Sequence, residues 1–505
     1  MNPDSLESKV RRLPLHLGPD SRRVLVRPFI PALVVKPFSQ PEPNQRVTHI
    51  FSRVMLLDDN AVRVALDEVL AEFDGRHLDI RSIFSERFEQ IRPMLPTDRE
   101  ISAERQLLLG SFFTNEYSLE SSALFNPSII AHPDQSGMDA GCLRFILSLR
   151  ATGEGHISSI TFRSGVLGPD CEVCLDPVSR YVVQPRPQPA ARYERSSFRR
   201  KLLELGVEDF AVDACTNSLG THFLMEELHS VVRRLRFDAE DPAVRRGAER
   251  ALLLARSNYT VRFDDGLQIS EKILFPFAQS ESNGIEDARL VAFREDDGSI
   301  TYHATYTAYD GSVVVPQLVT TRDFQEFSIC TLNGGAVRNK GLALFPRKIG
   351  GRFFMLGRQD SENIHIMSSE HLHFWHDSEV ILRPAEPWEF VQLGNCGSPI
   401  ETPRGWLVIT HGVGPMRKYC IGACLLDLEN PARVLARLRE PLLRPAPDER
   451  DGYVPNVVYS CGALVHQNQL VLPYAVSDTA TRFAVVALDE VLDAMHRTDR
   501  MSGTR

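Results

Sequence analysis

The sequence predicts a mainly β protein, a five-bladed β-propeller with an N-terminal helical region and a helical insertion between blades one and two. Strand–turn–strand units recur roughly every 55 to 60 residues in the C-terminal half, which is typical of propeller blades. Apolar residues at helical spacing are concentrated in two stretches, about residues 46–110 and about 168–262. Because one blade cannot bury both of its faces alone, we expect the repeats to close around a central pocket.

The chain of 505 residues is long enough for more than one domain. We expect an extended and helical region over residues 1–115, the propeller domain over 116–490 and a C-terminal tail over 491–505. The proline-rich segment 24–37 suits an edge strand or a strap across another domain. Helices are expected at 60–73, 79–92, 102–109, 193–205, 221–237, 242–256 and 488–497.

The repeat is clearest in the second strand of each unit. These strands are expected at 300–308, 352–358, 406–412 and 470–475, and each follows a turn at Gly298, Gly351, Gly405 or Asn468. A meander at 124–130, 143–151 and 156–163 has the same layout, with its turn at Gly141. It stands about 100 residues too far from the next unit, which matches an insertion at about 168–262.

Composition and charge narrow the class of protein. A net charge of −9 argues against nucleic acid or an anionic membrane as the main partner, and no apolar window is long enough to span a bilayer. The N-terminus lacks the apolar segment of a secretory signal, and nine scattered cysteines suit reduced thiols, so we expect a cytoplasmic protein. No metal site is expected at Cys171 and Cys174 or at His371 to His376.

The stretch from Asn283 to Leu290 is the chemical centre of the chain. Glu286 and Asp287 stand beside Arg289, directly after Gly284 and at the head of an alternating strand. A carboxylate at a strand start with a cation two residues away is placed to point into a cleft and to have its pKa tuned.

Equivalent points of the other repeats add polar side chains around the expected axis. They are Asn126 and Arg150; Tyr306 and Asp310; Lys340 and Arg358; His411; and Tyr474 and Asp478. Arg150, Tyr306, Arg358 and His411 end equivalent strands. One carboxylate cluster among several cations suits a neutral polyhydroxylated substrate together with an anion, most simply a sugar and a phosphate. A polar, water-filled channel is the alternative.

The motifs resemble those of glycoside hydrolase family 130, the β-mannoside phosphorylases and related β-mannosidases, which are five-bladed propellers. The resemblance covers roughly residues 122–490 apart from the insertion. The matching stretches are Gly284 to Arg289, Tyr306 to Asp310, Asn339 to Ile349, Gly405 to Val413, Gly422 to Asp427, Val454 to Val458 and Ser477 to Thr479.

The resemblance implies a role for each matched position. Asp287 corresponds to the general acid. Arg150, Lys340, Arg358 and His411 correspond to phosphate-binding positions, and Asn126, Glu286, Arg289, Tyr306, Asp310 and Asp478 are assigned to substrate binding. The chain departs from the family at Ala288, where proline is usual, and at Gly357 to Gln359, where a His-Arg-Pro run is frequent.

The implied reaction is an inverting phosphorolysis of β-mannosides that gives α-mannose 1-phosphate. Inorganic phosphate is then a co-substrate, no cofactor or metal is expected, and the partners are small oligosaccharides. Two alternatives stay open. A β-mannosidase of the same fold would need a second carboxylate about 6.5–9.5 Å from the acid, for which Glu362 and Glu401 are available. The second alternative is a non-catalytic sugar-binding propeller that uses its helical parts as partner surfaces. In an enzyme, the helical parts would cap the pocket, restrict acceptor length or form a homo-oligomer.

Overall fold

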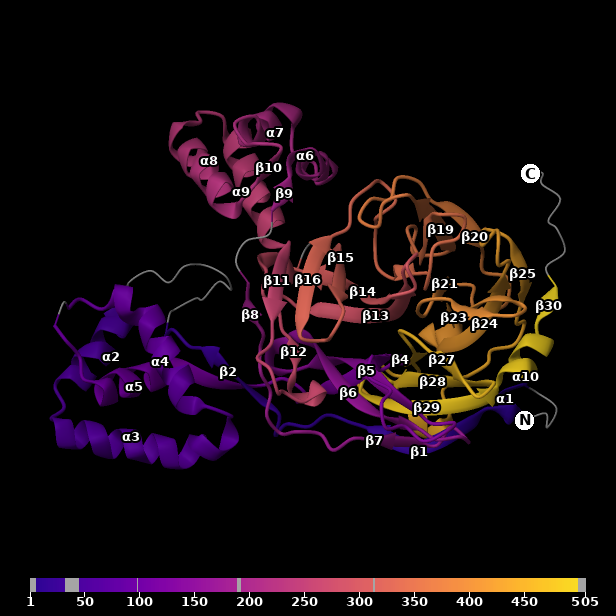
Figure 1. The fold of residues 1–505 in the computed structure, drawn as a ribbon, viewed down its shortest axis with the longest axis horizontal. Helices are drawn as coiled ribbons and strands as arrows, with labels where there is room; N and C mark the ends of the chain where they lie inside the picture. Colours follow the sequence, from indigo (N-terminus) through magenta and orange to yellow (C-terminus); the bar gives the residue numbers. More distant parts are fainter. Residues whose placement is uncertain (1–5, 32–44, 98, 189–191, 312–313, 498–505) are drawn as a thin grey trace.

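The computed structural model describes residues 6–31, 45–97, 99–188, 192–311 and 314–497. Two groups of helices project from a body of β-sheets (Figure 1). The helices are α1 (Leu6–Lys9), α2 (Gln45–Met55), α3 (Asp59–Phe73), α4 (Ile80–Ile91), α5 (Ala103–Phe112), α6 (Arg195–Glu204), α7 (Asp209–Thr216), α8 (Met225–Asp238), α9 (Pro242–Arg256) and α10 (Leu488–Asp493). Residues 32–37 of the proline-rich segment and 498–505 of the expected tail lie outside the described residues.

Within the described ranges, strands form five larger sheets, here called sheets 1 to 5 in chain order, and all their ladders are antiparallel. Sheet 1 has the order β12-β6-β5-β4, with β7 on β6, and sheet 2 has the order β13-β14-β15-β16-β11-β8. The bounds are β4 (Ala123–Ala131), β5 (Leu143–Thr152), β6 (Ser158–Leu167), β7 (Val173–Leu175), β8 (Arg186–Pro187), β11 (Tyr259–Arg262), β12 (Ile273–Leu274), β13 (Ile285–Arg294), β14 (Ile300–Tyr309), β15 (Val314–Thr321) and β16 (Glu326–Thr331).

Sheets 3, 4 and 5 follow the same strand layout. Their orders are β17-β18-β19-β20, then β21-β23-β24-β25-β30 with β22 on β23, then β1-β29-β28-β26 with β27 on β28. The bounds are β17 (Ala343–Leu344), β18 (Phe353–Gly357), β19 (Ile364–Ser369), β20 (Glu379–Leu382), β21 (Gln392–Asn395), β22 (Ile400–Thr402), β23 (Gly405–Val413), β24 (Tyr419–Leu426), β25 (Val434–Arg437), β30 (His496–Arg497), β1 (Arg11–Leu17), β26 (Val458–Tyr459), β27 (Leu464–His466), β28 (Gln469–Val476) and β29 (Ala480–Ala487).

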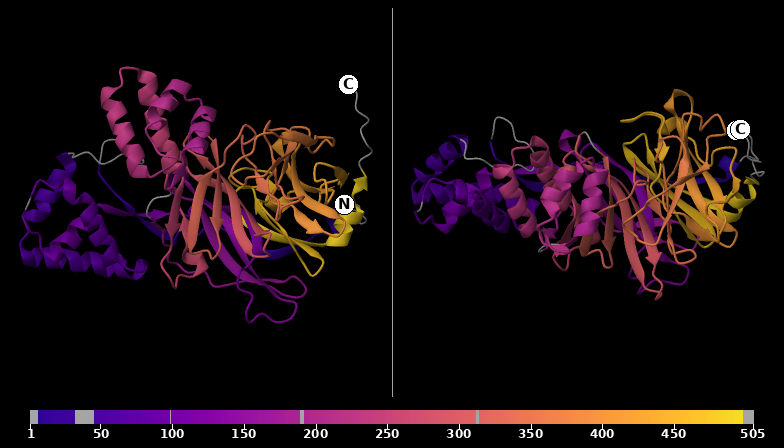
Figure 2. Two further views of the ribbon diagram at one scale, coloured as in Figure 1. Left: turned by 45° about the horizontal axis from the view of Figure 1, so that its top comes forward. Right: turned by 90° about the horizontal axis from the view of Figure 1, so that it is seen from above.

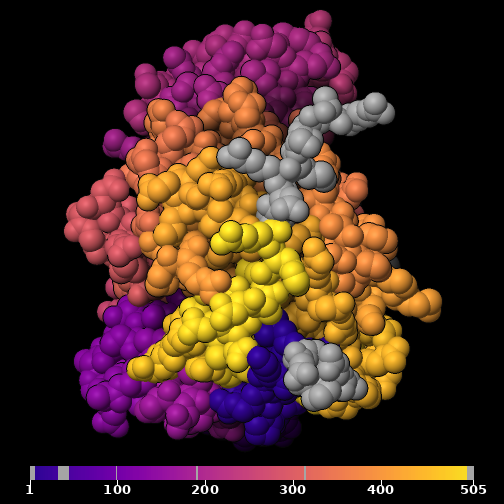
Figure 3. Space-filling view, turned by 90° about the vertical axis from the view of Figure 1, so that its right-hand side faces the viewer, coloured from indigo at the N-terminus to yellow at the C-terminus, as the bar shows by residue number. Residues whose placement is uncertain are grey.

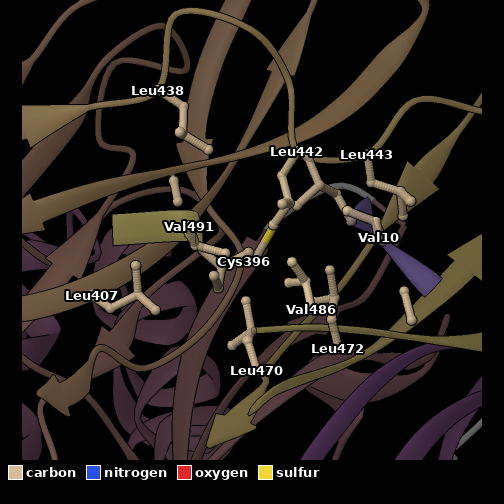
Figure 4. Packing of buried hydrophobic residues seen from close by; sticks show 14 of the residues in the cluster. Val10, Cys396, Leu407, Leu438, Leu442, Leu443, Leu470, Leu472, Val486 and Val491 are labelled. Carbon is tan, nitrogen blue, oxygen red and sulfur yellow. The ribbon is translucent and has the colours of Figure 1, made fainter. Parts of the chain in front are cut away.

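Apolar cores lie between neighbouring sheets. Ile160 and Ile285 belong to a core between sheets 1 and 2, while Leu147 and Val471 belong to one between sheets 1 and 5. Two further cores join sheets 2 with 3 and sheets 3 with 4. The core between sheets 4 and 5 includes Leu407 and Leu470 (Figure 4). Each sheet therefore buries apolar side chains against two other sheets, which is why central strands such as β23 are buried on both faces.

Both ends of the described chain join this body of sheets. β1 pairs with β29, so the N-terminal segment lies beside the C-terminal strands (Figure 3). The expected helix at 488–497 ends at Asp493 because His496 and Arg497 pair with β25 instead. The sequence reasoning did not predict β1, whose Pro14 sits on an edge strand, where a missing backbone donor is tolerated.

The two helical parts each have a small core of their own. Helices α2 to α5 enclose residues such as Phe51 and Leu109, and α6 to α9 enclose residues such as Leu202 and Leu228. A two-stranded ribbon of β2 (Val24–Pro28) and β3 (Thr114–Ser118) connects the first group to the sheets, and the second group is flanked by β9 (Tyr193–Glu194) and β10 (His222–Phe223) (Figure 2). Helix α7 was not predicted. None of the helices described is long and apolar enough to cross a membrane.

Candidate active site

Two neighbouring strands, β4 and β13, carry the same irregularity near their N-terminal ends. The register shifts between Phe125 and Ser128 in β4 and between Glu286 and Arg289 in β13. Within these bulges Asn126 has φ 50° and Asp287 has φ 57°, a left-handed conformation that is uncommon for residues with a Cβ. The two bulges turn the side chains towards each other, and Asn126 Nδ2 donates to Asp287 Oδ1 at 2.7 Å.

Arg150, near the end of β5, joins this pair to the adjacent carboxylate. Its Nη1 lies 3.3 Å from Asp287 Oδ1 and its Nη2 lies 2.8 Å from Glu286 Oε1, while its Nε donates to Ser158 Oγ at 2.9 Å. Lys340 Nζ donates to the other Glu286 oxygen. We call Asn126, Arg150, Glu286, Asp287 and Lys340 the carboxylate cluster.

The charge of Asp287 is set by opposing effects. Burial alone raises its pKa, but Arg150, the hydrogen bond from Asn126, and the charges of Arg289 and Lys340 outweigh burial and hold the pKa below 3.8. Asp287 is therefore ionised at neutral pH in the unliganded protein. Any anion that binds to Arg150 or Lys340 will weaken this stabilisation and raise the pKa of Asp287.

Asp478 is a third carboxylate whose charge interacts with that of Asp287. It follows β28 in a left-handed conformation, φ 50°. Burial, and then the negative charge of Asp287, raise the pKa of Asp478 to about 6, although Arg150 and Arg417 act in the opposite direction. Asp287 and Asp478 thus have pKa values on opposite sides of the ordinary aspartate value.

Arg358 and His411 form a second polar group on sheets 3 and 4. Arg358 Nη1 donates to His411 Nε2 at 3.1 Å, so this ring nitrogen is the acceptor. Burial, Arg358 and Arg289 together lower the pKa of His411 well below 6.5. His411 is therefore neutral, and it orients the Arg358 guanidinium rather than adding a positive charge.

A buried network joins the two groups. Arg289 is 3% exposed and donates to the carbonyl oxygens of Gly341 and Asn395 and, at 2.6 Å, to Tyr459 Oη. The Tyr459 ring meets the His411 ring edge-on at 4.9 Å. Arg289 thus connects sheet 2 with sheets 4 and 5 and with the segment that precedes β17. Sequence reasoning missed Ser158, Asn395 and Tyr459, although Tyr459 directly follows the motif from Val454 to Val458.

Two tyrosines predicted to face the pocket lie in the cores between sheets. Tyr306 Oη donates to the buried Glu281, which also accepts from Tyr259, and Tyr474 Oη donates to Glu449 at 2.6 Å. The hydroxyl of Tyr306 is therefore used in the core between sheets 1 and 2, although the residue also lines a small cavity with Asp287 and Arg289. Asp310 directly follows β14 and is half-buried.

The carboxylates proposed for a hydrolase do not reach the carboxylate cluster. Glu401 pairs with Arg347 at 2.6 Å and with Arg294 at 3.3 Å. Glu362 is exposed in the turn after β18, where its backbone nitrogen donates to Asp360. Glu401 is thus used by a surface ion-pair group, and Glu362 stands in an exposed turn.

Other features singled out from the sequence lie elsewhere. His371 and His373 line a cavity of about 760 Å³ between α6 and sheets 2 and 3. No group of three or more potential metal ligands occurs among the residues that the structure describes. This cavity is separate from the carboxylate cluster.

Comparisons with known proteins agree on one group of enzymes. A family profile described as beta-1,4-mannooligosaccharide phosphorylase matches residues 252–497. A beta-1,2-mannobiose phosphorylase of Listeria innocua is 34% identical over 272 residues, which make up 51% of this chain and 75% of that protein. A 1,2-beta-oligomannan phosphorylase of a Thermoanaerobacter species is 32% identical over 254 residues, 47% of this chain and 80% of that protein. The Listeria innocua enzyme has also been solved with beta-1,2-mannobiose, and that structure covers 75% of this chain and 92% of its own, with 24% identity and a TM-score of 0.45.

Proposed function

Because the chain belongs to glycoside hydrolase family 130, we propose that it is an inverting phosphorylase that cleaves β-mannosides with inorganic phosphate and releases α-mannose 1-phosphate. The observation that carries the proposal is the hydrogen-bonded Asp287, held by Asn126 and Arg150 among further cations. This arrangement combines one acid with an anion site, as phosphorolysis requires.

We propose that the five sheets are the blades of a propeller spanning 116–490, with the helical insertion at about 168–262, the N-terminal region at 1–115 and a tail from 491. The support is the packing, since each sheet shares an apolar core with two neighbours and sheet 5 meets sheet 1. In such a ring the bulges of β4 and β13 face the axis.

In the proposed reaction Asp287 gives a proton to the glycosidic oxygen, directly or through a sugar hydroxyl, as the bond from that oxygen to the anomeric carbon breaks. A phosphate oxygen forms the new bond from the opposite face, which inverts the configuration. The negative charge of phosphate near Arg150 and Lys340 raises the pKa of Asp287 and so favours the protonated acid at the moment when it is needed.

We assign phosphate binding to Arg150, Lys340 and Arg358, with His411 orienting Arg358. Arg150 and Lys340 have Glu286 as their partner in the unliganded protein, and phosphate would compete with that carboxylate. Asn126, Glu286, Asp310 and Asp478 remain our candidates for binding sugar hydroxyls. We assign Arg289 and Tyr306 to the framework, because their polar groups are used in buried contacts.

A β-mannosidase is the second candidate, and Asp478 is the observation that favours it. This carboxylate is electrostatically coupled to Asp287, as the base and acid of an inverting hydrolase are. Its pKa of about 6 makes the ionised carboxylate a stronger base than an ordinary aspartate and leaves it mostly ionised at neutral pH, as activation of water requires.

The test is phosphate release from α-mannose 1-phosphate in the presence of mannose or β-1,2-mannobiose as acceptor. We expect acceptor-dependent release, and Asp287→Asn should lower it about 10²–10⁴-fold. Asp297→Asn, at a surface turn, is the matched control and should be unchanged. Equal cleavage of β-1,2-mannobiose with and without phosphate would establish the hydrolase, and full activity of Asp287→Asn would refute the assignment of the acid.

A further inference from the structure

An exposed aromatic pair stands on the Asp478 side of the candidate site. The rings of His156 and Tyr453 are stacked, with centroids 5.7 Å apart and planes at 30°. Tyr453 is 63% exposed although His156 covers one face of its ring, so the other face is open to solvent. His156 comes from the turn between β5 and β6, and Tyr453 comes from the segment before β26.

Both residues are tied to the site through the backbone. The Tyr453 nitrogen donates to Thr479 Oγ1 at 2.9 Å, directly beside Asp478. His156 lies two residues before Ser158, the acceptor for Arg150 Nε. The aromatic pair is thus held by segments that also carry Asp478 and the hydrogen-bond acceptor of Arg150.

The N-terminal ribbon fixes the turn that carries His156. Tyr117 Oη, on β3, contacts the carbonyl oxygens of Glu154 and Ile157 at 2.9 and 3.3 Å. The backbone of the turn also lies close to β3, since a Cβ on Gly153 would lie 2.4 Å from the Ser118 carbonyl oxygen. The position of His156 therefore depends on a part of the chain outside the body of sheets.

We propose that Tyr453, backed by His156, is the platform for the leaving-group sugar of the β-mannoside, and that the N-terminal ribbon holds this platform in place. The inference rests on the proposed function and specifies its acceptor subsite. A pyranose ring has an apolar C–H face that gains from covering an open aromatic ring, and a tyrosine offers that area with few rotatable bonds to immobilise. In the synthetic direction the same platform receives the acceptor.

The test separates acceptor binding from donor binding. In synthesis from α-mannose 1-phosphate and mannose, Tyr453→Ala should raise the KM for the acceptor about tenfold, a value within the range expected for loss of an aromatic contact. The KM for α-mannose 1-phosphate should not change. Tyr453→Phe should behave like the wild type, and Phe237→Ala, an exposed ring on α8, is the matched control.

The positioning role of the ribbon has its own variant. Tyr117→Phe removes the hydroxyl contacts to the turn and should raise the acceptor KM less than Tyr453→Ala does, with the donor KM again unchanged. The proposed role of Tyr453 would be refuted if Tyr453→Ala left the acceptor KM unchanged. It would also be refuted if the KM values for donor and acceptor rose equally.

Calorimetric titration with β-1,2-mannobiose distinguishes this proposal from the proposed function. If the wild type binds β-1,2-mannobiose and Tyr453→Ala weakens that binding, the platform is supported. If the same wild-type protein shows no phosphorolysis, only the proposed function fails. Equal binding by both proteins overturns the platform alone. Absence of both turnover and binding in the wild type overturns both.

Discussion

Asn126 and Asp287 face each other from matching bulges in strands of sheets 1 and 2, and Asn126 donates a 2.7 Å hydrogen bond to the carboxylate that we propose as the acid. Both residues have positive φ angles, 50° and 57°. Strained backbone of this kind is retained when the surrounding structure over-determines it, and it is frequent at functional sites. The relationship makes Asn126 a determinant of the charge of Asp287.

Asn126→Ala should therefore shift the pH dependence of phosphorolysis. The hydrogen bond stabilises the ionised carboxylate and contributes to the lowered pKa of Asp287, so its loss raises that pKa. The limb of the rate profile that reports Asp287 should move to higher pH. The measurement is kcat/KM against pH for wild type and variant, and coincident limbs would contradict the role given to Asn126.

Lys340→Met should raise the KM for phosphate about 10–100-fold, because it removes a charge-assisted contact of about 1.4–2.8 kcal/mol. The KM for β-1,2-mannobiose should change much less. Lys348→Met is the control, since this lysine pairs with Asp296 and stacks on Phe353. Equal effects of the two substitutions on the phosphate KM would exclude a specific role for Lys340.

Tyr306→Phe should destabilise the protein by about 1–3 kcal/mol without changing the KM for phosphate or sugar. Its hydroxyl is one of the donors to the buried Glu281, and an under-bonded buried carboxylate is costly. Thermal unfolding should show a lower midpoint, whereas Tyr181→Phe, which removes an exposed hydrogen bond with Arg180, should have little effect. A raised KM with normal stability would return Tyr306 to the binding site.

Asp478→Asn should stabilise the protein at neutral pH. The pKa of Asp478 rises from 3.8 to about 6 on folding, so the folded state binds the proton more tightly and stability declines as pH rises from about 4 to about 6. The asparagine variant lacks this decline and should gain on the order of 1–3 kcal/mol at pH 7.5 but nothing near pH 3.5. Thermal unfolding at both pH values checks this, and a constant difference would contradict it.

The outcome at individual residues shows where sequence reasoning succeeds. The second strands of the repeat appear as β14, β18, β23 and β28, because alternating apolar residues and glycine turns act over short distances. Asn126, Arg150, Glu286, Asp287 and Lys340 were selected from equivalent positions of the repeat, and the structure brings them together.

Tyr306, Tyr474 and Arg289 show which contacts such reasoning does not reach. Each stands at or near a strand end, as a pocket residue would, but the face of a strand that meets a neighbouring sheet cannot be read from the strand alone. Buried glutamates accept hydrogen bonds from the hydroxyls of both tyrosines. The guanidinium of Arg289 donates to three groups from distant parts of the chain.

Local sequence pattern is thus sufficient for the strand units, the helical stretches and the polar residues at the head of β13. It contains no information on the pairing of β1 with β29, on the Tyr459 contact between Arg289 and His411, or on the stacking of His156 against Tyr453. Those contacts join residues far apart in the chain, and they arise only when sheets bury their apolar faces against one another and bring distant loops to the same edge.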